Sequence, residues 1–212
     1  SGSGKTTFGR LVNGLIPCYY EGKLTGSVMV NGNDTTQLQL HELAGTVGSV
    51  FQNPKSQFYT LLTDTEIVFA CENIGMEKRE ILRRFTETVQ DFRLEKLLGK
   101  NVSQLSGGEK QRISIARCIL KDAPIVILDE ATASVDTDNE SYIQEAISEL
   151  VKGKTLLVIA HRLNTIRQAD QILVIDNGQI AQQGTHEELL KQPGIYQDFV
   201  NIRKSAAGWS LA

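Results

Sequence analysis

Residues 125–130 read Ile125-Val126-Ile127-Leu128-Asp129-Glu130, an apolar run that ends in two carboxylates. Four consecutive apolar residues are typical of a strand that is buried on both faces of a parallel sheet. Ligands of such sheets bind at the carboxyl ends of the strands, where Asp129 and Glu130 would lie. There Asp129 can hold Mg²⁺, and Glu130 can polarise a water molecule for attack on a γ-phosphate. The alternative is that the two acids only cap the helix that follows.

Strands and helices alternate around this run, which predicts an α/β fold with the strands of 125–128, 155–160 and 171–175 in a parallel sheet covered on both faces. Further strands are expected at 26–30, 47–51, 155–160 and 171–175, and helices at 5–15, 63–73, 77–92, 109–120, 138–151 and 163–168. Asn31-Gly32 follows the first of these strands and is typical of a tight hairpin turn. We predict one domain over residues 1–212, with an α/β core at 1–52 and 121–212 and an inserted helical subdomain at 53–120.

The chain opens with a glycine-rich stretch, Ser1-Gly2-Ser3-Gly4-Lys5-Thr6-Thr7. It matches the C-terminal part of the phosphate-loop pattern GxxxxGK[ST], without the first glycine. Gly2 and Gly4 let backbone N–H groups curl around an anion, and the helix that follows presents its positive end to that anion. Lys5 would reach the β- and γ-phosphates, and the Thr6 hydroxyl would ligate Mg²⁺. The alternative is a glycine-rich helix start with an exposed lysine.

A third motif, Leu105-Ser106-Gly107-Gly108-Glu109-Lys110-Gln111-Arg112, precedes the strand at 125–128. Ser106 and the two glycines open a helix, and the N–H groups of its first turn are available to another anion. Taken alone, the motif is also consistent with an ordinary helix cap that contains permissive glycines. Lys110 and Arg112 are expected to be exposed helix charges or contacts to a partner.

Together these motifs resemble those of the ATP-binding cassette (ABC) ATPases, and the resemblance covers essentially the whole chain. Six motifs follow the order of that family: SGSGKTT at 1–7, VFQNP at 50–54, LSGGEKQR at 105–112, ILDEAT at 127–132, SVD at 134–136 and AHR at 160–162. The resemblance implies a P-loop NTPase (RecA-like) core with an inserted α-helical signature subdomain and a remnant antiparallel β-subdomain. It also implies an N-terminal truncation, because the strand before the phosphate loop and the adenine-stacking aromatic of the family would precede Ser1.

The resemblance further implies a head-to-tail dimer with two ATP molecules between the subunits. One subunit would bind ATP through Ser1, Gly2, Ser3, Gly4, Lys5, Thr6 and Thr7, and its partner would bind the same ATP through Ser106, Gly107 and Gly108. Mg²⁺ would be held by Thr6, Gln52 and Asp129. The catalytic residues would be Glu130, His161 and Gln52, and Asp136 would couple the two sites. A lone histidine after a strand can equally be structural, which is the alternative for His161.

The two halves of the chain resemble different branches of the family. Asn13-Gly14-Leu15-Ile16-Pro17, Phe51-Gln52-Asn53-Pro54 and Cys71-Glu72-Asn73 look like the ATPases of energy-coupling-factor importers. The stretches at 129–136, 159–163 and 184–190 look like the ATPase domains of exporters. The change falls near LSGGEKQR, which both branches share, so the direction of transport stays open.

We therefore expect an ATPase subunit or domain that hydrolyses ATP with Mg²⁺ and drives a membrane transporter. Its partners would be a second ABC ATPase domain, in a homo- or heterodimer, and a transmembrane domain or subunit at the cytoplasmic face of the membrane. The alternative is an ABC ATPase that moves no solute, such as a translation or DNA-maintenance factor. The long coiled coils of chromosome-type members and the zinc cysteines of repair-type members do not occur in this sequence.

The composition excludes several other classes of protein. The 22 Lys and Arg residues against 25 Asp and Glu residues give a net charge of −3, which argues against a broad nucleic-acid surface. Apolar runs such as 156–160 are too short to span a bilayer. The three cysteines have no zinc or disulfide spacing, which favours a reducing compartment. His41 and His186 are expected to be solvated.

Overall fold

The computed structural model describes residues 2–51, 53–129, 147–148, 151–159 and 166–208. The chain divides into two compact units, which we describe separately. The C-terminal unit consists of Ser1–Phe8 and Val158–Ala212, and the central unit is Gly9–Leu157.

The elements alternate along the chain as the sequence predicts. The helices of the described part are α1 (Lys5–Val12), α2 (Leu15–Cys18), α3 (Leu40–Thr46), α4 (Thr63–Asn73), α5 (Lys78–Asp91), α6 (Gly107–Lys121), α9 (His186–Lys191) and α10 (Ile195–Gly208). Short 3-10 helices are η1 (Thr35–Gln37), η2 (Pro54–Gln57), η3 (Glu95–Leu97) and η4 (Val102–Gln104). The strands are β1 (Met29–Val30), β2 (Asn33–Asp34), β3 (Val47–Val50), β4 (Ile125–Asp129), β5 (Thr155–Ile159), β6 (Ile172–Asp176) and β7 (Gln179–Gly184).

A sheet with the order β3-β4-β5 positions the predicted magnesium ligand of the central unit. β3 and β4 run parallel, with Val47 opposite Ile125 and Val50 opposite Leu128. Residues 126–128 are buried, as the apolar run predicts, because helices and loops cover both faces of the strand. Asp129 therefore ends β4 at the same edge of the sheet at which β3 ends.

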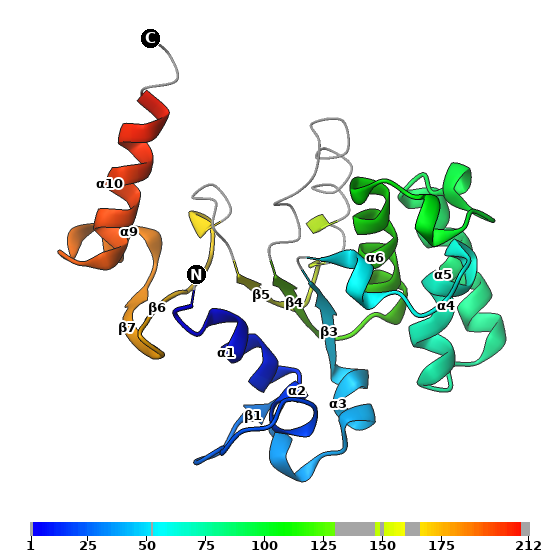
Figure 1. The fold of residues 1–212 in the computed structure, drawn as a ribbon, viewed down its shortest axis with the longest axis horizontal. Helices are drawn as coiled ribbons and strands as arrows, with labels where there is room; N and C mark the ends of the chain where they lie inside the picture. Colours follow the sequence, from blue (N-terminus) through cyan, green and yellow to red (C-terminus); the bar gives the residue numbers. More distant parts are fainter. Residues whose placement is uncertain (1, 52, 130–146, 149–150, 160–165, 209–212) are drawn as a thin grey trace. The chain divides into compact units, whose positions relative to one another are not determined.

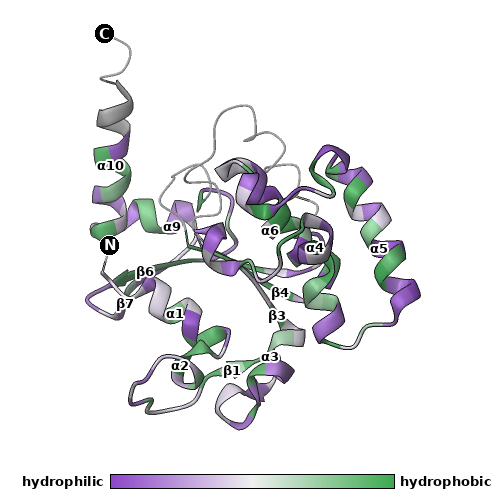
Figure 2. Cartoon of the chain, turned by 45° about the vertical axis from the view of Figure 1, so that its right-hand side comes forward, coloured by the Kyte–Doolittle hydropathy of each residue, from purple (hydrophilic) through white to green (hydrophobic). Residues whose placement is uncertain are grey.

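Helices α4, α5 and α6 pack side by side in the central unit (Figure 1). Their shared core contains Ile67 and Cys71 of α4, Ile81 of α5 and Ile113 of α6. α5 alternates between hydrophilic and hydrophobic residues along its length, which is the pattern of an amphipathic helix (Figure 2). The described residues contain no helix that combines the length and the apolar composition required to cross a bilayer.

Helix α6 approaches the sheet closely at a glycine. A Cβ atom on Gly48 of β3 would lie 2.7 Å from the Cys118 sulfur of α6, so only glycine fits there. The Lys121 ammonium at the end of α6 donates to the Val47 carbonyl at 2.9 Å. Burial lowers the pKa of Lys121. These contacts fix α6 against the start of β3.

The C-terminal unit is built around a hairpin that the sequence analysis did not predict. The strand expected at 171–175 was assigned to the parallel sheet, but β6 pairs antiparallel with β7. Asn177 and Gly178 join the two strands with φ angles of 48° and 76°, the left-handed conformation of a two-residue hairpin turn. Helices α9 and α10 pack on this unit through a core of Ile172, Leu189, Tyr196 and Val200.

Several predicted boundaries differ from those of the structure. The helix expected at 5–15 ends at Val12, because Gly14 adopts a left-handed φ of 74°. The strand expected at 26–30 is shortened to β1, followed by the predicted turn at Asn31-Gly32. Most of the helices expected at 138–151 and 163–168 lie outside the described residues.

The three cysteines are free thiols. Cys18 is exposed, whereas Cys71 and Cys118 are buried. Burial raises the pKa of Cys71 and of Cys118 to about 11, so both stay protonated near neutral pH.

Candidate functional site

The loop at the start of the chain contains two glycines with positive φ angles. Gly2 and Gly4 have φ angles of 88° and 102°, which side chains other than glycine rarely adopt. The loop leads directly into α1, whose first turn carries no acidic residue. The N–H groups of that turn have no partners inside the helix, so they are available to a negative group.

A cationic side chain of this loop, Lys5, contacts a polar one, Ser3. The Lys5 ammonium donates to the Ser3 hydroxyl at 2.8 Å, so the amine is folded back over the loop. Thr6 and Thr7 are exposed in the first turn of α1. Ser3, Gly4, Lys5 and Thr6 all lie in the C-terminal unit.

Asp129 belongs to the central unit, where it ends β4. The next strand of the sheet, β3, ends at Val50 and leads to the segment that contains Gln52. Carboxylate, amide and hydroxyl oxygens are the ligands that Mg²⁺ prefers, so Asp129, Gln52 and Thr6 have suitable chemistry. Within the described ranges, no three His, Cys, Asp or Glu residues gather as a metal cluster.

Helix α6 begins at Ser106 with a capping box. The Ser106 hydroxyl accepts a hydrogen bond from the Glu109 N–H at 3.2 Å, and the Glu109 carboxylate accepts one from the Ser106 N–H at 2.7 Å. The Ser106 N–H holds the pKa of Glu109 below its usual value of 4.5. Ser106 and Gly107 are exposed, and a Cβ atom on Gly107 would meet no atom within 4 Å. The start of α6 is therefore open to another molecule.

The structure contradicts the expectation that Lys110 is exposed, because its side chain is only 6% accessible. The Lys110 ammonium donates to the Leu105 carbonyl at 2.6 Å and to the Ser103 carbonyl at 3.4 Å. Lys110 lies three residues before the buried Ile113, so it shares the inner face of α6. It fixes the segment that enters α6. Arg112 is half-buried and donates to the Phe92 and Arg93 carbonyls.

A buried polar network holds the segment that follows Gln52, and no sequence motif pointed to it. The Arg117 guanidinium of α6 donates to the Glu66 carboxylate of α4 and to the Gln57 carbonyl of η2. Gln57 also accepts a hydrogen bond from the Ser114 hydroxyl through its side chain. Glu66 is fully buried, and Gln57 is 5% exposed. The only available signal was helical spacing, which places Ser114 and Arg117 on the same face as Lys110.

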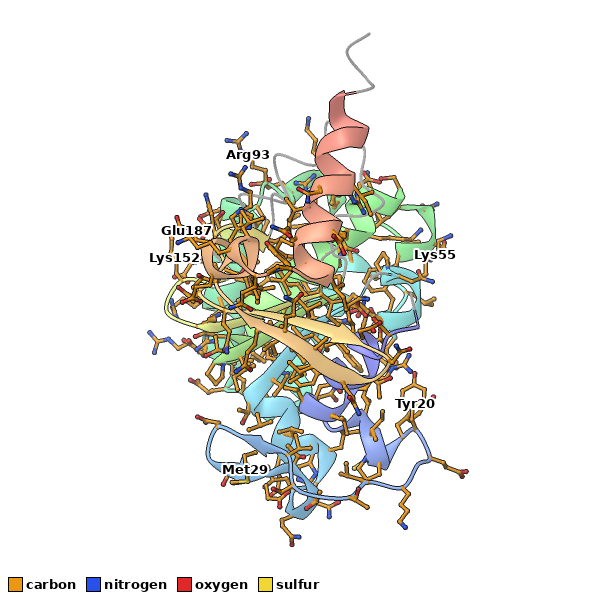
Figure 3. All side chains as sticks on the ribbon, turned by 90° about the vertical axis from the view of Figure 1, so that its left-hand side faces the viewer. Tyr20, Met29, Lys55, Arg93, Lys152 and Glu187 are labelled. Atoms are coloured by element: carbon orange, nitrogen blue, oxygen red, sulfur yellow. The ribbon has the colours of Figure 1, made fainter. Side chains whose placement is uncertain are left out.

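The second Glu66 oxygen orders the chain between η2 and α4. It accepts hydrogen bonds from the Tyr59 N–H at 3.0 Å, the Thr60 N–H at 2.9 Å and the Thr60 hydroxyl at 3.0 Å. The Tyr59 ring stacks on Phe69, with 5.3 Å between the ring centroids. In contrast, Lys55 extends from the surface of η2 (Figure 3). The network thus fixes the inner side of this segment and leaves its outer side exposed.

The family model that matches this chain is that of the ABC transporter, and it covers residues 1–133. The chain belongs to the ABC transporter family. Its relatives include a "Putative ABC transporter ATP-binding protein" of Treponema denticola, 40% identical over 86% of this chain and 38% of the relative. An "ATP-dependent lipid A-core flippase" of Burkholderia thailandensis is 42% identical over 96% of this chain and 34% of the flippase. The chain thus spans little more than a third of the length of these relatives.

Solved structures include an ABC exporter with the same fold. The structure of a bacterial Atm1-family ABC exporter with ATP bound matches 96% of this chain and 35% of that chain. The TM-score is 0.77 and the sequence identity is 32%. These ABC relatives give no support to the alternative of a protein that moves no solute.

Five of the predicted ABC site residues lie outside the described residues. They are Ser1, Gln52, Glu130, Asp136 and His161. The structure describes the remaining ones in two groups, with residues 2–7 in the C-terminal unit and residues 106–108 and 129 in the central unit.

His41 and His186 were both expected to be solvated. His41 is exposed, as expected. His186 is half-buried instead, and its Nδ1 lies 2.7 Å from the Tyr196 hydroxyl. The reason is that α10 packs across α9 and covers this side of the ring.

Proposed function

We propose that this chain binds Mg-ATP and hydrolyses it to ADP and phosphate as the ATPase domain of an ABC transporter. The main support is the loop of residues 2–5, in which two glycines with positive φ precede a lysine and an open helix start. The chain would bind the phosphates through Ser1, Gly2, Ser3, Gly4, Lys5, Thr6 and Thr7. Lys5 would exchange the Ser3 hydroxyl for the β- and γ-phosphates.

Mg²⁺ would be held by Thr6, Gln52 and Asp129, which supply only oxygen ligands. When bound, Mg²⁺ would neutralise charge that develops on the phosphate oxygens. The position of Asp129 at the end of a buried strand supports this assignment, because it directs the carboxylate to the ligand-binding edge of the sheet. Gln52 would lie on the neighbouring connection and report the state of this site to the rest of the protein.

Glu130 would act as the general base that orients and polarises the attacking water. His161 and Gln52 would hold that water and the γ-phosphate in line. These roles are inferred from the order of the motifs. Asp129 and Glu130 are adjacent carboxylates, so one can bind Mg²⁺ while the other acts as the base.

A second copy of such a domain would complete the site. Ser106, Gly107 and Gly108 of the partner would bind the γ-phosphate, and Asp136 would couple the two sites across the dimer. The exposed, capped start of α6 supports this role because its N–H groups attract anions. ATP would therefore stabilise the dimer, and hydrolysis would release it.

We further propose that the domain works at the cytoplasmic face of a membrane with a transmembrane domain or subunit and without nucleic acid. The flippase of Burkholderia thailandensis and the exporter, which each match 96% of this chain, favour export over import. Residues 53–120 would form the helical subdomain of this machine and residues 1–52 and 121–212 its α/β core. The packing of α4, α5 and α6 supports this division.

The proposed base can be tested with Glu130→Gln, which keeps the shape of the side chain but cannot take a proton. We expect phosphate release to fall by about 10²- to 10⁴-fold while Mg-ATP still binds. Phosphate release at the parent rate would show that Glu130 is not the base.

The shared site can be tested with Ser106→Arg mixed with Lys5→Ala. Each variant alone should be inactive, whereas their heterodimer keeps one composite site with both Lys5 and Ser106 intact, so part of the activity should return. Thr185→Arg is the matched control, because Thr185 caps α9 with the same capping box outside the proposed site. A mixture without activity, or an equal loss in the control, would contradict the shared site.

A further inference from the structure

The turn between β6 and β7 lies against the phosphate loop within the C-terminal unit. The Gly178 N–H donates to the Ser3 carbonyl at 3.1 Å. A Cβ atom on Gly4 would lie 3.4 Å from the Gly178 Cα and 3.8 Å from the Ile175 Cγ2. Both views of the chain show this hairpin beside the start of α1 (Figures 1 and 2). Even a Cβ atom at Gly4 would thus be in van der Waals contact with Gly178, so the two backbones lie next to each other.

The hydrogen bond to Ser3 also determines the direction of the next N–H group. Ser3 C=O and Gly4 N–H belong to one peptide unit, which is planar and trans, so the two groups point in opposite directions. Because Gly178 holds the Ser3 carbonyl toward the hairpin, the Gly4 N–H must point away from the hairpin. Gly4 N–H is one of the groups that the proposed phosphate site would use.

We infer that the Asn177–Gly178 turn is a positioning element that aims the Gly4 N–H of the phosphate loop at the phosphates. The inference rests on the proposed binding of Mg-ATP. The contact between this turn and the phosphate loop is not part of the site motifs, because residues 177 and 178 lie far from residues 1–7 in the sequence.

Lys5 shows why this support matters once a ligand arrives. Ser3 is held by two contacts, the Lys5 ammonium on its hydroxyl and the Gly178 N–H on its carbonyl. When Lys5 turns to a phosphate, the first contact is lost. The hairpin contact then remains to prevent the Ser3–Gly4 peptide from rotating.

The chain contains a matched control for this turn. Asn31-Gly32 joins β1 and β2 with φ angles of 50° and 79°, against 48° and 76° for Asn177-Gly178. A Cβ atom on Gly32 or on Gly178 would meet no atom within 4 Å. Alanine therefore introduces the same backbone strain in both turns, but only the turn at 178 contacts the phosphate loop.

The test compares Gly178→Ala with Gly32→Ala in the purified chain. Both variants should lose a similar amount of thermal stability, because alanine disfavours the left-handed conformation. Only Gly178→Ala should weaken the binding of Mg-ATP and of pyrophosphate, by about tenfold or more, the value of one hydrogen bond to a charged group. Gly178→Asn should restore the affinity, because asparagine tolerates positive φ, as Asn177 itself does.

The outcomes separate this inference from the proposed function. If the parent chain does not bind Mg-ATP by calorimetric titration, the proposed function fails and the inference fails with it. If the parent binds and Gly178→Ala binds equally well, or if both alanine variants weaken binding equally, the inference alone is wrong.

A measurement without mutation covers the case in which Gly178→Ala does not fold. Hydrogen exchange of the Gly178 amide in the parent chain should slow when pyrophosphate binds, because the bound loop holds the Ser3 carbonyl in place. The Gly32 amide should exchange at an unchanged rate. Equal behaviour of the two amides in the presence of bound pyrophosphate would overturn the inference.

Discussion

Lys110 illustrates how one charged residue can set the geometry of a binding motif without facing the ligand. Its ammonium donates to two carbonyls of the segment that enters α6, and its side chain is almost fully buried. Buried charge is costly unless it is hydrogen-bonded, so these two carbonyls and the lysine stabilise each other. The position of Ser106 depends on this contact, because Leu105 immediately precedes it.

Lys110→Met should destabilise the chain by about 1–3 kcal/mol, since methionine preserves the volume but leaves the two carbonyls without their donor. Lys96→Met is the control, because Lys96 is exposed in η3 and its replacement should change the free energy of unfolding by less than about 0.5 kcal/mol. Urea denaturation measures both values. Equal midpoints for the two variants would show that the Lys110 contacts contribute nothing.

Glu66→Gln should cost about 3–5 kcal/mol of folding free energy, because it leaves the Arg117 guanidinium without its buried counter-charge. Glu72→Gln on the exposed face of α4 is the control and should be nearly neutral. Hydrogen exchange at Tyr59 and Thr60 gives a local readout, since Glu66 accepts from both amides. Unchanged exchange there would contradict the role of Glu66 in ordering this segment.

At the scale of residues, the sequence predicted the positions of the motifs better than the buried contacts that hold the motifs in place. The described parts of these patterns, 2–7, 105–112 and 125–129, lie where elements begin or end, as predicted, because glycine, serine and carboxylate positions are local signals. Gln57, Glu66 and Arg117 could not be found because their contact joins three elements. Lys110 is buried although lysine is usually exposed, because its spacing of three residues from Ile113 places it on the inner face of α6.

Among the elements, α6 has a charged carboxylate in the capping box at its start. Glu109 has a pKa below 4.5 in the folded chain, because its carboxylate accepts the Ser106 N–H. A lowered folded pKa means that the carboxylate contributes stability fully above the unfolded value and loses it as the pH falls through the folded value. The capping box should therefore be complete at neutral pH and weaken in acid.

The comparison of the parent with Glu109→Gln tests this pH dependence. The difference in the free energy of unfolding should be constant above about pH 4.5 and shrink below it, because a protonated glutamate resembles the neutral amide. Urea denaturation at pH 7, 5 and 3.5 measures the difference. A difference that stays constant down to pH 3.5 would contradict the lowered pKa.

The sequence also contained a signal for the β6–β7 hairpin, although that hairpin was not predicted. Asn177-Gly178, which follows an apolar strand, is the same hairpin signal as Asn31-Gly32, which was recognised. The expectation of alternating strands and helices concealed it, because that pattern assigned the strand at 171–175 to the parallel sheet. β7 itself is mostly exposed and polar, so its hydrophobic pattern was weak.

For the whole molecule, ligand binding should couple to folding. Mg-ATP at a concentration 100 times its Kd should add about 2.7 kcal/mol to the free energy of unfolding and raise Tm. Lys5→Ala should abolish most of this shift, whereas Lys23→Ala, which removes an exposed lysine outside the site, should preserve it. Thermal scans with and without Mg-ATP provide the measurement, and equal shifts in both variants would exclude Lys5 from the phosphate site.

The order of motifs carried most of the information about the whole molecule. Six short patterns in one order pointed to the ABC family, and the match over residues 1–133 bears this out. The division into Ser1–Phe8 with Val158–Ala212 and Gly9–Leu157 was not visible in the sequence. It brings the first residues of the chain to a hairpin near its other end, and such long-range contacts leave no local pattern.

The unequal burial of the three cysteines makes the chain suited to site-specific labelling. A maleimide reacts with the thiolate, and Cys71 and Cys118 combine burial with a pKa of about 11. Cys18 is exposed at the end of α2, so a fluorophore added at neutral pH would attach at this single position. Two such labelled chains would report their association by energy transfer, without any engineered cysteine or the removal of a native one.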